Sequence, residues 1–153
     1  MTVTTRLFNM RPTIFNNLRT YIQQLESSIK SNEWDIFDPN CKRIELKDSN
    51  LNSIINSGLG RKHIINPNET TIHYIKYNLD KDYILREHHD GCKHTIILYL
   101  NKDNTISDEF YVDNKLIENS NWEYNGFIMD GCLKHKGVFR GTGNRNILCI
   151  FIK

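Results

Sequence analysis

Beyond Pro67 the sequence becomes a succession of short runs rich in Ile, Tyr, Phe and Val, separated by Asn, Asp and Gly. Short apolar runs bounded by turn-forming residues are typical of β-strands. The clearest runs cover residues 70–79, 95–100, 109–112, 126–129 and 146–152. Many short strands in succession favour a closed or double-sheet antiparallel core.

The last of these runs restricts the architecture further, because it is apolar on both sides. Alternate residues of a strand point to opposite faces of its sheet. One face carries Ile147, Cys149 and Phe151, and the other carries Leu148, Ile150 and Ile152. A strand buried on both sides is expected in a sheet that has helices outside it and a lined cavity inside it.

The N-terminal part of the chain carries the pattern of helices that would provide this cover. Between residues 12 and 31, apolar side chains recur at spacings of three and four, which marks one face of a helix. Those side chains are Ile14, Leu18, Tyr21, Ile22, Leu25 and Ile29. A short strand is predicted at residues 42–46, and Asp48 is expected to cap a second helix that ends at Gly58 or Gly60. The predicted fold class is therefore α+β, mainly β.

The length of 153 residues is typical of one domain, and the sequence has no internal repeat or Pro/Gly-rich linker. We therefore expect residues 1–153 to form a single domain, with a helical buttress at about 12–60 and a β core at about 70–153. The 20 Lys and Arg residues nearly balance the 18 Asp and Glu residues. A net charge of only +2 does not favour nucleic acid or an anionic membrane as the partner.

Other features bear on the compartment. No apolar run approaches the roughly 18 residues of a membrane span, and residues 1–17 lack the apolar stretch of a signal peptide. The four cysteines form no CxxC pair and have no regular spacing. Free thiols of this kind are typical of a reducing compartment, which predicts an intracellular, cytoplasmic protein.

The residues best suited to metal binding or catalysis are His88, Asp90 and His135. On an extended segment, residues two apart point to the same side, so His88 and Asp90 are expected to face one point while His89 faces away. His135 follows the predicted strand at 126–129 and supplies a second imidazole. Two histidines and one carboxylate form a facial triad that leaves positions open on Fe(II) for a cosubstrate and oxygen.

Arg145 begins the last predicted strand, ten residues after His135. A dicarboxylate that chelates iron through one end needs a cation at its other end, and Arg offers a planar fork of two donors. We therefore expect the Arg145 guanidinium to lie semi-buried in the cavity, unpaired until a ligand binds. Arg140 is the alternative cation, but its position among turn residues favours a surface loop or the site entrance.

Together these residues resemble the metal and cosubstrate signature of the Fe(II)/2-oxoglutarate-dependent dioxygenases. Residues 95–103 (TIILYLNKD) are similar to the strand that follows the HxD motif in prolyl hydroxylases, where the residue equivalent to Tyr99 helps to hold 2-oxoglutarate. Tyr77 and Tyr83 are similar to a pair of tyrosines that precedes that motif, and residues 134–148 (KHKGVFRGTGNRNIL) resemble the family's C-terminal motif. The resemblance covers about residues 72–153. The segment 106–110 (ISDEF) departs from it, because the family commonly has Gly-Gly there.

The resemblance implies a double-stranded β-helix, or jelly-roll, core with the N-terminal helices packed on the larger sheet. It implies that His88, Asp90 and His135 are the catalytic metal ligands for Fe(II), and that Arg145 and Tyr99 bind 2-oxoglutarate. The other implied reactants are O2, ascorbate as a candidate reductant, and a protein or peptide substrate hydroxylated on a side chain such as proline, with succinate and CO2 as co-products. Two alternatives stay open: an oxygenase acting on a nucleobase or small metabolite, and a non-enzymatic jelly-roll binding module.

Overall fold

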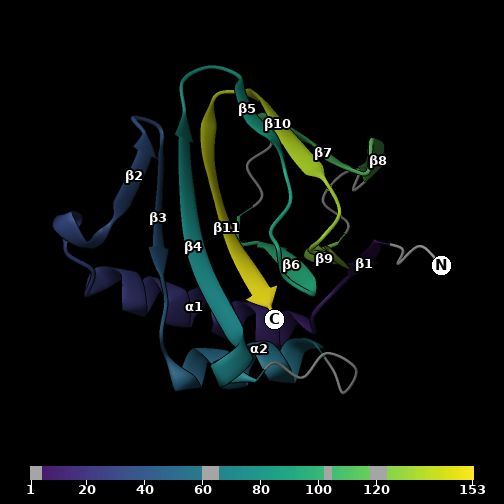
Figure 1. The fold of residues 1–153 in the computed structure, drawn as a ribbon. Coiled ribbons are helices and arrows are strands. Elements are labelled where there is room, and N and C mark those ends of the chain that lie inside the picture. Colours follow the sequence, from purple (N-terminus) through teal and green to yellow (C-terminus); the bar gives the residue numbers. More distant parts are fainter. Residues whose placement is uncertain (1–4, 60–65, 102–104, 118–123) are drawn as a thin grey trace.

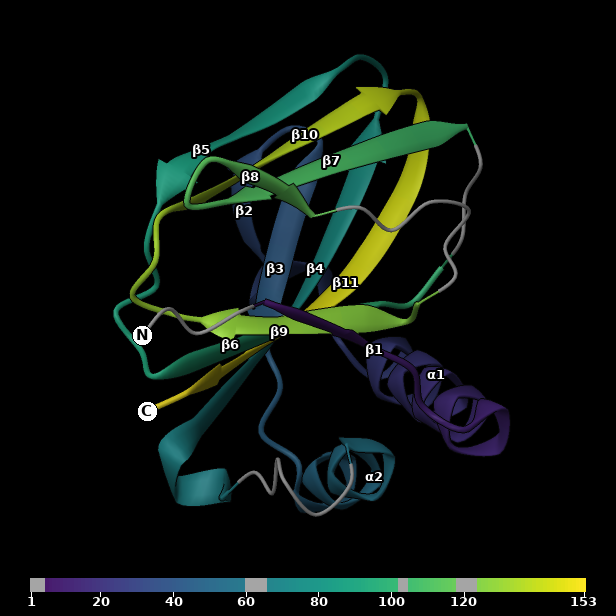
Figure 2. The same cartoon turned by 90° about the vertical axis from the view of Figure 1, so that its right-hand side faces the viewer.

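Two antiparallel sheets make up the β core of the computed structural model, which describes residues 5–59, 66–101, 105–117 and 124–153 (Figure 1). In spatial order, the seven-stranded sheet consists of β1 (Arg6–Phe8), β9 (Gly126–Asp130), β6 (His94–Tyr99), β11 (Gly143–Ile152), β4 (Thr70–Leu79), β3 (Cys41–Glu45) and β2 (Asp35–Asp38). The four-stranded sheet consists of β5 (Tyr83–His88), β10 (His135–Gly141), β7 (Ile106–Val112) and β8 (Lys115–Ile117). Figure 2 shows the smaller sheet stacked over the larger one, which is the jelly-roll arrangement that the sequence predicted.

Strand β11 lies in the middle of the larger sheet, between β4 and β6, and both of its faces are buried. Leu148 and Ile150 face the hydrophobic core that the sheet shares with the helices. Ile147 and Cys149 face the second core, between the two sheets, and line a cavity there. The two-sided burial predicted from the alternating pattern is therefore confirmed.

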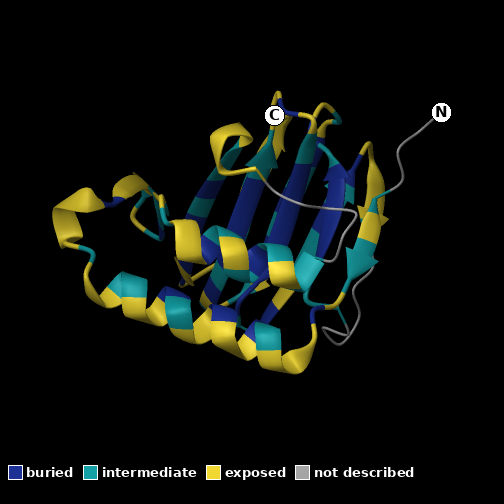
Figure 3. Ribbon diagram, turned by 90° about the horizontal axis from the view of Figure 1, so that it is seen from below, coloured by how far each residue is buried: buried dark blue, intermediate teal, exposed yellow. Residues whose placement is uncertain are grey.

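Helices α1 (Pro12–Ser27) and α2 (Ser49–Leu59) cover the outer face of the larger sheet, and Figure 3 shows that their exposed residues lie on the side away from the strands. Their buried residues are Phe15, Leu18, Ile22, Leu51 and Ile55. Asp48 caps α2 as predicted, because its Oδ1 accepts a hydrogen bond from the backbone N–H of Leu51 at 3.0 Å. The helices thus pack on the larger sheet, in agreement with the sequence analysis.

Helix α1 differs from the predicted helix in two respects. It ends at Ser27, before a 3-10 turn at Ser31–Glu33, and Phe15 rather than Ile14 is buried at its beginning. The helical period places Phe15 on the same side as Leu18 and Ile22, and leaves Ile14 at the edge of the apolar face, where it is half-buried. The core-facing stripe of α1 is therefore rotated slightly from the predicted one.

Two strands near the N-terminus were not predicted. β1 pairs with β9, and β2 pairs with β3, so both lie at edges of the larger sheet. β1 has only three residues, and Ile36 and Phe37 of β2 are exposed, so neither segment alternates apolar and polar residues in the way that marks a strand. Among the described residues, no helix combines the length and apolar character needed to cross a membrane.

Replacing Leu18 with Ala is expected to lower the free energy of unfolding by about 2–5 kcal/mol, because this fully buried side chain would leave a cavity between α1 and the sheet. Ile14→Ala on the same helix is the matched control and should cost less than about 1 kcal/mol. Urea unfolding followed by circular dichroism measures both. Equal losses for the two variants would contradict the assignment of the buried face.

Candidate metal centre

The antiparallel pairing of β10 with β5 brings His135 directly opposite His88. Gly137 pairs with Leu85, so a regular register would place Glu87 opposite His135. One extra residue in β5, a β-bulge, shifts the register and puts His88 there instead. The bulge thereby directs both histidines toward the space between the sheets.

Asp90 reaches the same point from outside a strand. β5 ends at His88, so the alternation expected of an extended segment does not continue to Asp90. Instead, the backbone N–H of Asp90 donates a hydrogen bond to the carbonyl of Gly131 at 2.9 Å, and Gly91, with φ of 68°, turns the chain after it. A Cβ atom at position 131 would lie 2.4 Å from Sγ of Cys92, so glycine there allows the two segments to approach.

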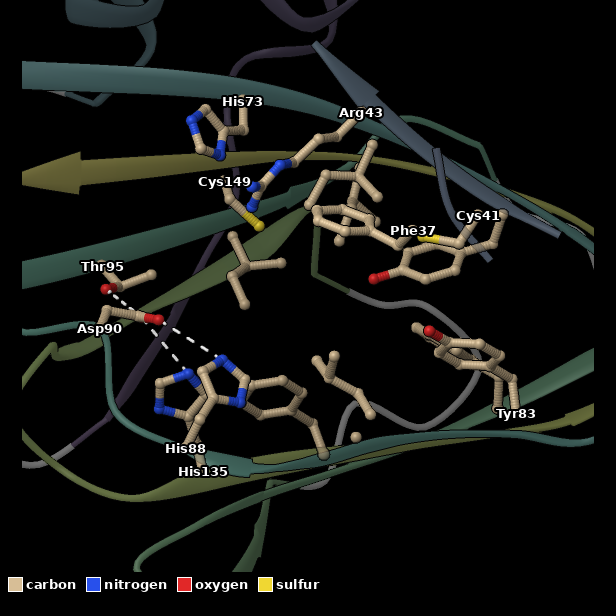
Figure 4. Close-up of a pocket in the computed structure, with 18 of the residues that line it drawn as sticks. Phe37, Cys41, Arg43, His73, Tyr83, His88, Asp90, Thr95, His135 and Cys149 are labelled. Carbon is tan, nitrogen blue, oxygen red and sulfur yellow. Dashed lines mark hydrogen bonds and ion pairs between the residues drawn. The ribbon is translucent and has the colours of Figure 1, made fainter. Parts of the chain in front are cut away.

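The three side chains converge, and their ligand atoms all lie within 4.8 Å of one another (Figure 4). Nε2 of His88 is 3.5 Å from Oδ1 of Asp90, and Nε2 of His135 is 3.3 Å from Oδ2 of Asp90. Nδ1 of His88 lies 2.7 Å from the carbonyl oxygen of Arg86, and Nδ1 of His135 lies 3.0 Å from that of Leu133. A carbonyl in this position accepts a hydrogen bond from Nδ1–H, so Nε2 is the nitrogen of each ring that is available to a metal ion.

The electrostatics of the site keep Asp90 ionised. Burial disfavours its charged form, but hydrogen bonds from His135, His88 and Thr95 outweigh burial and hold the pKa of Asp90 well below its usual range. Asp90 in turn raises the pKa of His88 by accepting a hydrogen bond from it, against the opposing effect of burial. The hydroxyl of Thr95, on β6, fixes the carboxylate by donating to Oδ2 at 2.7 Å.

A cavity of about 510 Å³ lies between the sheets, with the three side chains in its wall. The rest of the wall is mainly aromatic and aliphatic, and includes Tyr77 and Tyr83, whose ring centroids are 5.6 Å apart. Tyr99 lines the cavity too. Positive charge comes to the lining from Arg43 and Arg86, and Figure 4 shows the Arg43 side chain on the wall opposite the two histidines.

Arg145 lies close to Tyr99, with its Cζ atom 5.9 Å from the centroid of the tyrosine ring. The expectation of an unpaired, semi-buried guanidinium is wrong. Arg145 is fully buried, its Nη2 is 2.9 Å from Oδ1 of Asp108 on β7, and its Nη1 donates to the carbonyl of Asn101 at 2.8 Å. An arginine without a counterion would be costly at this depth, and Asp108 neutralises it. Neither Arg145 nor Asp108 is among the described residues that line the cavity.

Sequence reasoning missed three side chains of this region. Thr95 and Arg43 carried no signal, because a single threonine or arginine on a strand has no distinguishing pattern. Asp108 did carry one, since it lies in the segment 106–110 that departs from the Gly-Gly of the dioxygenases. The departure marked a rebuilt region without indicating that the new carboxylate would pair with Arg145.

Three solved structures share this fold. A prolyl-4-hydroxylase from Pseudomonas putida matches with a TM-score of 0.61 at 11% identity, over 98% of this chain and 91% of that chain. A 2OG-Fe(II) oxygenase family oxidoreductase from Burkholderia pseudomallei matches with a TM-score of 0.55 at 11% identity, over 87% of this chain and 76% of that one. KdgF from Halomonas sp. matches with a TM-score of 0.50 at 12% identity, over 82% and 91% of the two chains.

No family model and no curated protein matches the sequence. Similarity at 11–12% identity establishes the fold alone. The resemblance to 2-oxoglutarate-dependent dioxygenases, and to their prolyl hydroxylase branch, is therefore confirmed for the fold. The chain has an oxygenase-like jelly-roll with a His-Asp-His group in the wall of its cavity.

The donor set fits Fe(II). Two imidazole nitrogens and one carboxylate oxygen are the ligands of the facial triad, which binds non-haem Fe(II) and leaves coordination positions open. The side chain of His88 is 40% exposed, whereas that of His135 is 3% exposed, so the site lies between the buried wall and solvent. A metal ion held here would be open to ligands from the cavity.

Replacing His88, Asp90 or His135 with Ala should abolish tight binding of Fe(II) or Mn(II), because each change removes one of three ligands. His89→Ala is the matched control, since His89 is exposed and lies beside two of the ligands in the chain. Titration calorimetry with Mn(II) under anaerobic conditions measures the affinities. Loss of binding in the His89 variant with retention in the His88 variant would contradict the ligand set.

Replacing Arg145 with Met should lower the free energy of unfolding by about 3–5 kcal/mol, because it leaves the carboxylate of Asp108 buried without its counterion. Arg140 forms a comparable pair with Glu109 at 3.1 Å, but its side chain is 55% exposed, so Arg140→Met should unfold like wild type. Urea unfolding at pH 8 tests both. If the Arg145→Met variant unfolds at the same urea concentration as wild type, the buried pair is not part of the folded core.

Proposed function

We propose that this protein is an Fe(II)- and 2-oxoglutarate-dependent dioxygenase that hydroxylates a protein side chain such as proline. The observation that carries the proposal is the convergence of two imidazole nitrogens and a carboxylate oxygen within 4.8 Å, in the wall of a cavity between the sheets of an oxygenase-like fold. The motif resemblance over residues 72–153 supports the same activity.

In this proposal, His88, Asp90 and His135 hold the metal. Bound iron would supply activation of O2 coupled to the oxidative decarboxylation of 2-oxoglutarate to succinate and CO2. The protein's own contribution is to orient the ligands: Thr95 fixes the carboxylate, and the carbonyls of Arg86 and Leu133 fix the two imidazoles. The apolar walls of the cavity keep water away from the reacting groups.

Arg145 and Tyr99 are the residues we propose for the distal carboxylate of 2-oxoglutarate. Tyr99 lines the cavity on β6, and Arg145 lies behind it on the neighbouring strand β11. Arg binds carboxylates through two parallel N–H donors, and a tyrosine hydroxyl adds a third. Support for this assignment is their adjacency and the motifs that contain them.

A prolyl side chain is the proposed target because the motifs resemble those of prolyl hydroxylases, and because a prolyl-4-hydroxylase shares the fold over 98% of this chain. The aromatic rings of Tyr77, Tyr83 and Phe139 would suit an apolar ring. Tyr77 and Phe139 have ring centroids 4.7 Å apart in the cavity wall. Proline-containing peptides are accordingly the first substrates to test.

The test is succinate formation by purified protein with Fe(II), 2-oxoglutarate, O2 and ascorbate. We expect turnover that increases with a proline-containing peptide and yields a product heavier by one oxygen atom, detected by mass spectrometry. His135→Ala should form no succinate above the rate without protein. Succinate that increases only with a nucleobase or small metabolite would overturn the proposed substrate, and no succinate from a metal-loaded protein would favour a binding module.

Tyr99→Phe should raise the apparent constant for 2-oxoglutarate by about threefold to tenfold, because it removes one neutral hydrogen bond and keeps the ring packing. Arg140→Gln is the control and should leave that constant unchanged, since Arg140 pairs with Glu109 on the surface. Initial rates of succinate formation at varied 2-oxoglutarate give both constants. A raised constant for 2-oxoglutarate in the Arg140→Gln variant, with an unchanged constant in the Tyr99→Phe variant, would contradict the assignment.

A further inference from the structure

The Arg145–Asp108 pair stands where the proposed cosubstrate needs a free cation. Nη2 of Arg145 is 2.9 Å from Oδ1 of Asp108, and the two side chains are 0% and 7% exposed. Arg145 also contacts the carbonyls of Asn101 and Ile106 at 2.8 and 3.5 Å. The guanidinium therefore already has, inside the protein, the kind of partner that the distal carboxylate of 2-oxoglutarate would be.

The pair is electrically neutral, and that limits what can join it. Bringing a second carboxylate to Arg145 would leave two negative charges against one positive charge in a dry site. An unbalanced buried charge is costly, and a group in that position takes up a proton instead. Three groups face Asp108: the Arg145 guanidinium on β11, the Tyr99 hydroxyl on β6, and the uncharged ring of Phe139, its partner on β10. Burial raises the pKa of Tyr99, so its hydroxyl is neutral.

We infer that Asp108 is a specificity-determining residue that competes with the distal carboxylate of 2-oxoglutarate for Arg145, so that this cosubstrate binds with uptake of one proton by Asp108. The inference rests on the proposed function, because it concerns the same cosubstrate and the same arginine. The inference also implies that the protein discriminates between 2-oxo acids by whether they carry a distal carboxylate.

Two further observations support Asp108 as the proton acceptor. Burial raises its pKa to about 6 even though Arg145 opposes the rise, so the carboxylate is already close to protonation near neutral pH. Its Oδ2 atom is buried and has no hydrogen-bond partner among the described residues. A proton on that oxygen would leave Oδ1 facing Arg145 and release the charge of the guanidinium to a ligand.

The sign of the pH effect follows from linkage. Binding of the distal carboxylate raises the pKa of Asp108 above its value in the free protein, so binding strengthens as pH falls from the higher pKa toward about 6. Between the two pKa values, the affinity for 2-oxoglutarate rises by nearly tenfold for each unit by which the pH falls. Below the lower pKa the affinity stops rising, because Asp108 is then already protonated in the free protein. A 2-oxo acid without a distal carboxylate has no such dependence.

The experiment is anaerobic titration calorimetry of the full chain saturated with Mn(II), using 2-oxoglutarate and 2-oxopentanoate. The second compound ends in a methyl group where the first has a carboxylate, so any effect of pH on the metal ligands is common to both. Titrations in two buffers of different ionisation enthalpy count the protons taken up. For wild type at pH 7.5 we expect about one proton with 2-oxoglutarate and none with 2-oxopentanoate.

Asp108→Asn removes the competing charge and keeps an oxygen for Arg145. The substitution should increase the affinity for 2-oxoglutarate at least tenfold at pH 8, abolish the proton uptake, and leave the affinity for 2-oxopentanoate unchanged. Glu109→Gln is the matched control, since Glu109 is the adjacent carboxylate and pairs with the exposed Arg140. If the Asn variant fails to fold, the proton count for wild type still decides the matter.

Other outcomes would overturn the inference. Equal proton uptake for the two acids, or weaker 2-oxoglutarate binding in the Asp108→Asn variant, would show that Asp108 positions Arg145 rather than competing for it. Loss of 2-oxoglutarate binding in Arg43→Gln would place the distal carboxylate at that cavity-lining arginine, whose nearest described carboxylate, Asp35, is 4.0 Å away. Binding of neither acid to the Mn(II) form would overturn the proposed function itself.

Discussion

The two-sided burial of β11 is the constraint on which the rest of the structure depends. Its even-numbered side chains, such as Leu148 and Ile150, need a cover outside the larger sheet, which α1 and α2 provide. Its odd-numbered side chains, such as Ile147 and Cys149, face the smaller sheet, so the space between the sheets is apolar and closed to bulk water on that side. The same alternation carries Arg145 into that space, at the far end of the strand from the C-terminus. The register of this central strand therefore determines which residues of its two neighbours, β4 and β6, lie beside its inward-facing side chains.

The candidate metal centre is assembled by irregular backbone rather than by regular strands. The bulge in β5 exchanges Glu87 for His88 opposite His135, and the segment after β5 brings Asp90 to both rings. Such irregularities suit a site that must gather three ligands on one point, because a regular strand offers only every second residue to one face. Backbone carbonyls then fix both imidazoles, so the site is ordered by the chain itself before any metal arrives.

Much of this could be predicted from the sequence, and the misses have physical reasons. The strands of the larger sheet with long apolar runs, both helices, and the grouping of His88, Asp90 and His135 were predictable because burial and ligand chemistry leave a pattern in the residues. β5 and β10 were not recognised as strands, since charged residues and glycine interrupt their apolar positions. The bulge in β5 could not be predicted either, because one extra residue in a strand leaves no pattern in the sequence. Asp108 was missed for a different reason: its ion pair with Arg145 joins β7 and β11, which lie in different sheets, so it depends on how the two sheets stack.

A common rule governs the charges between the sheets. Where the space is dry, each resident charge has a partner of opposite sign or a set of donors: Asp90 has Thr95 and the two histidines, and Arg145 has Asp108. Arg43 differs, since its side chain is 37% exposed and lies over the ring of Phe37, where water shares the solvation of its charge. A ligand that brings a charge into the dry part must therefore displace or neutralise a resident group, whereas one that brings it to Arg43 need not. Selectivity among anionic ligands thus depends on how deep in the cavity each one places its charge.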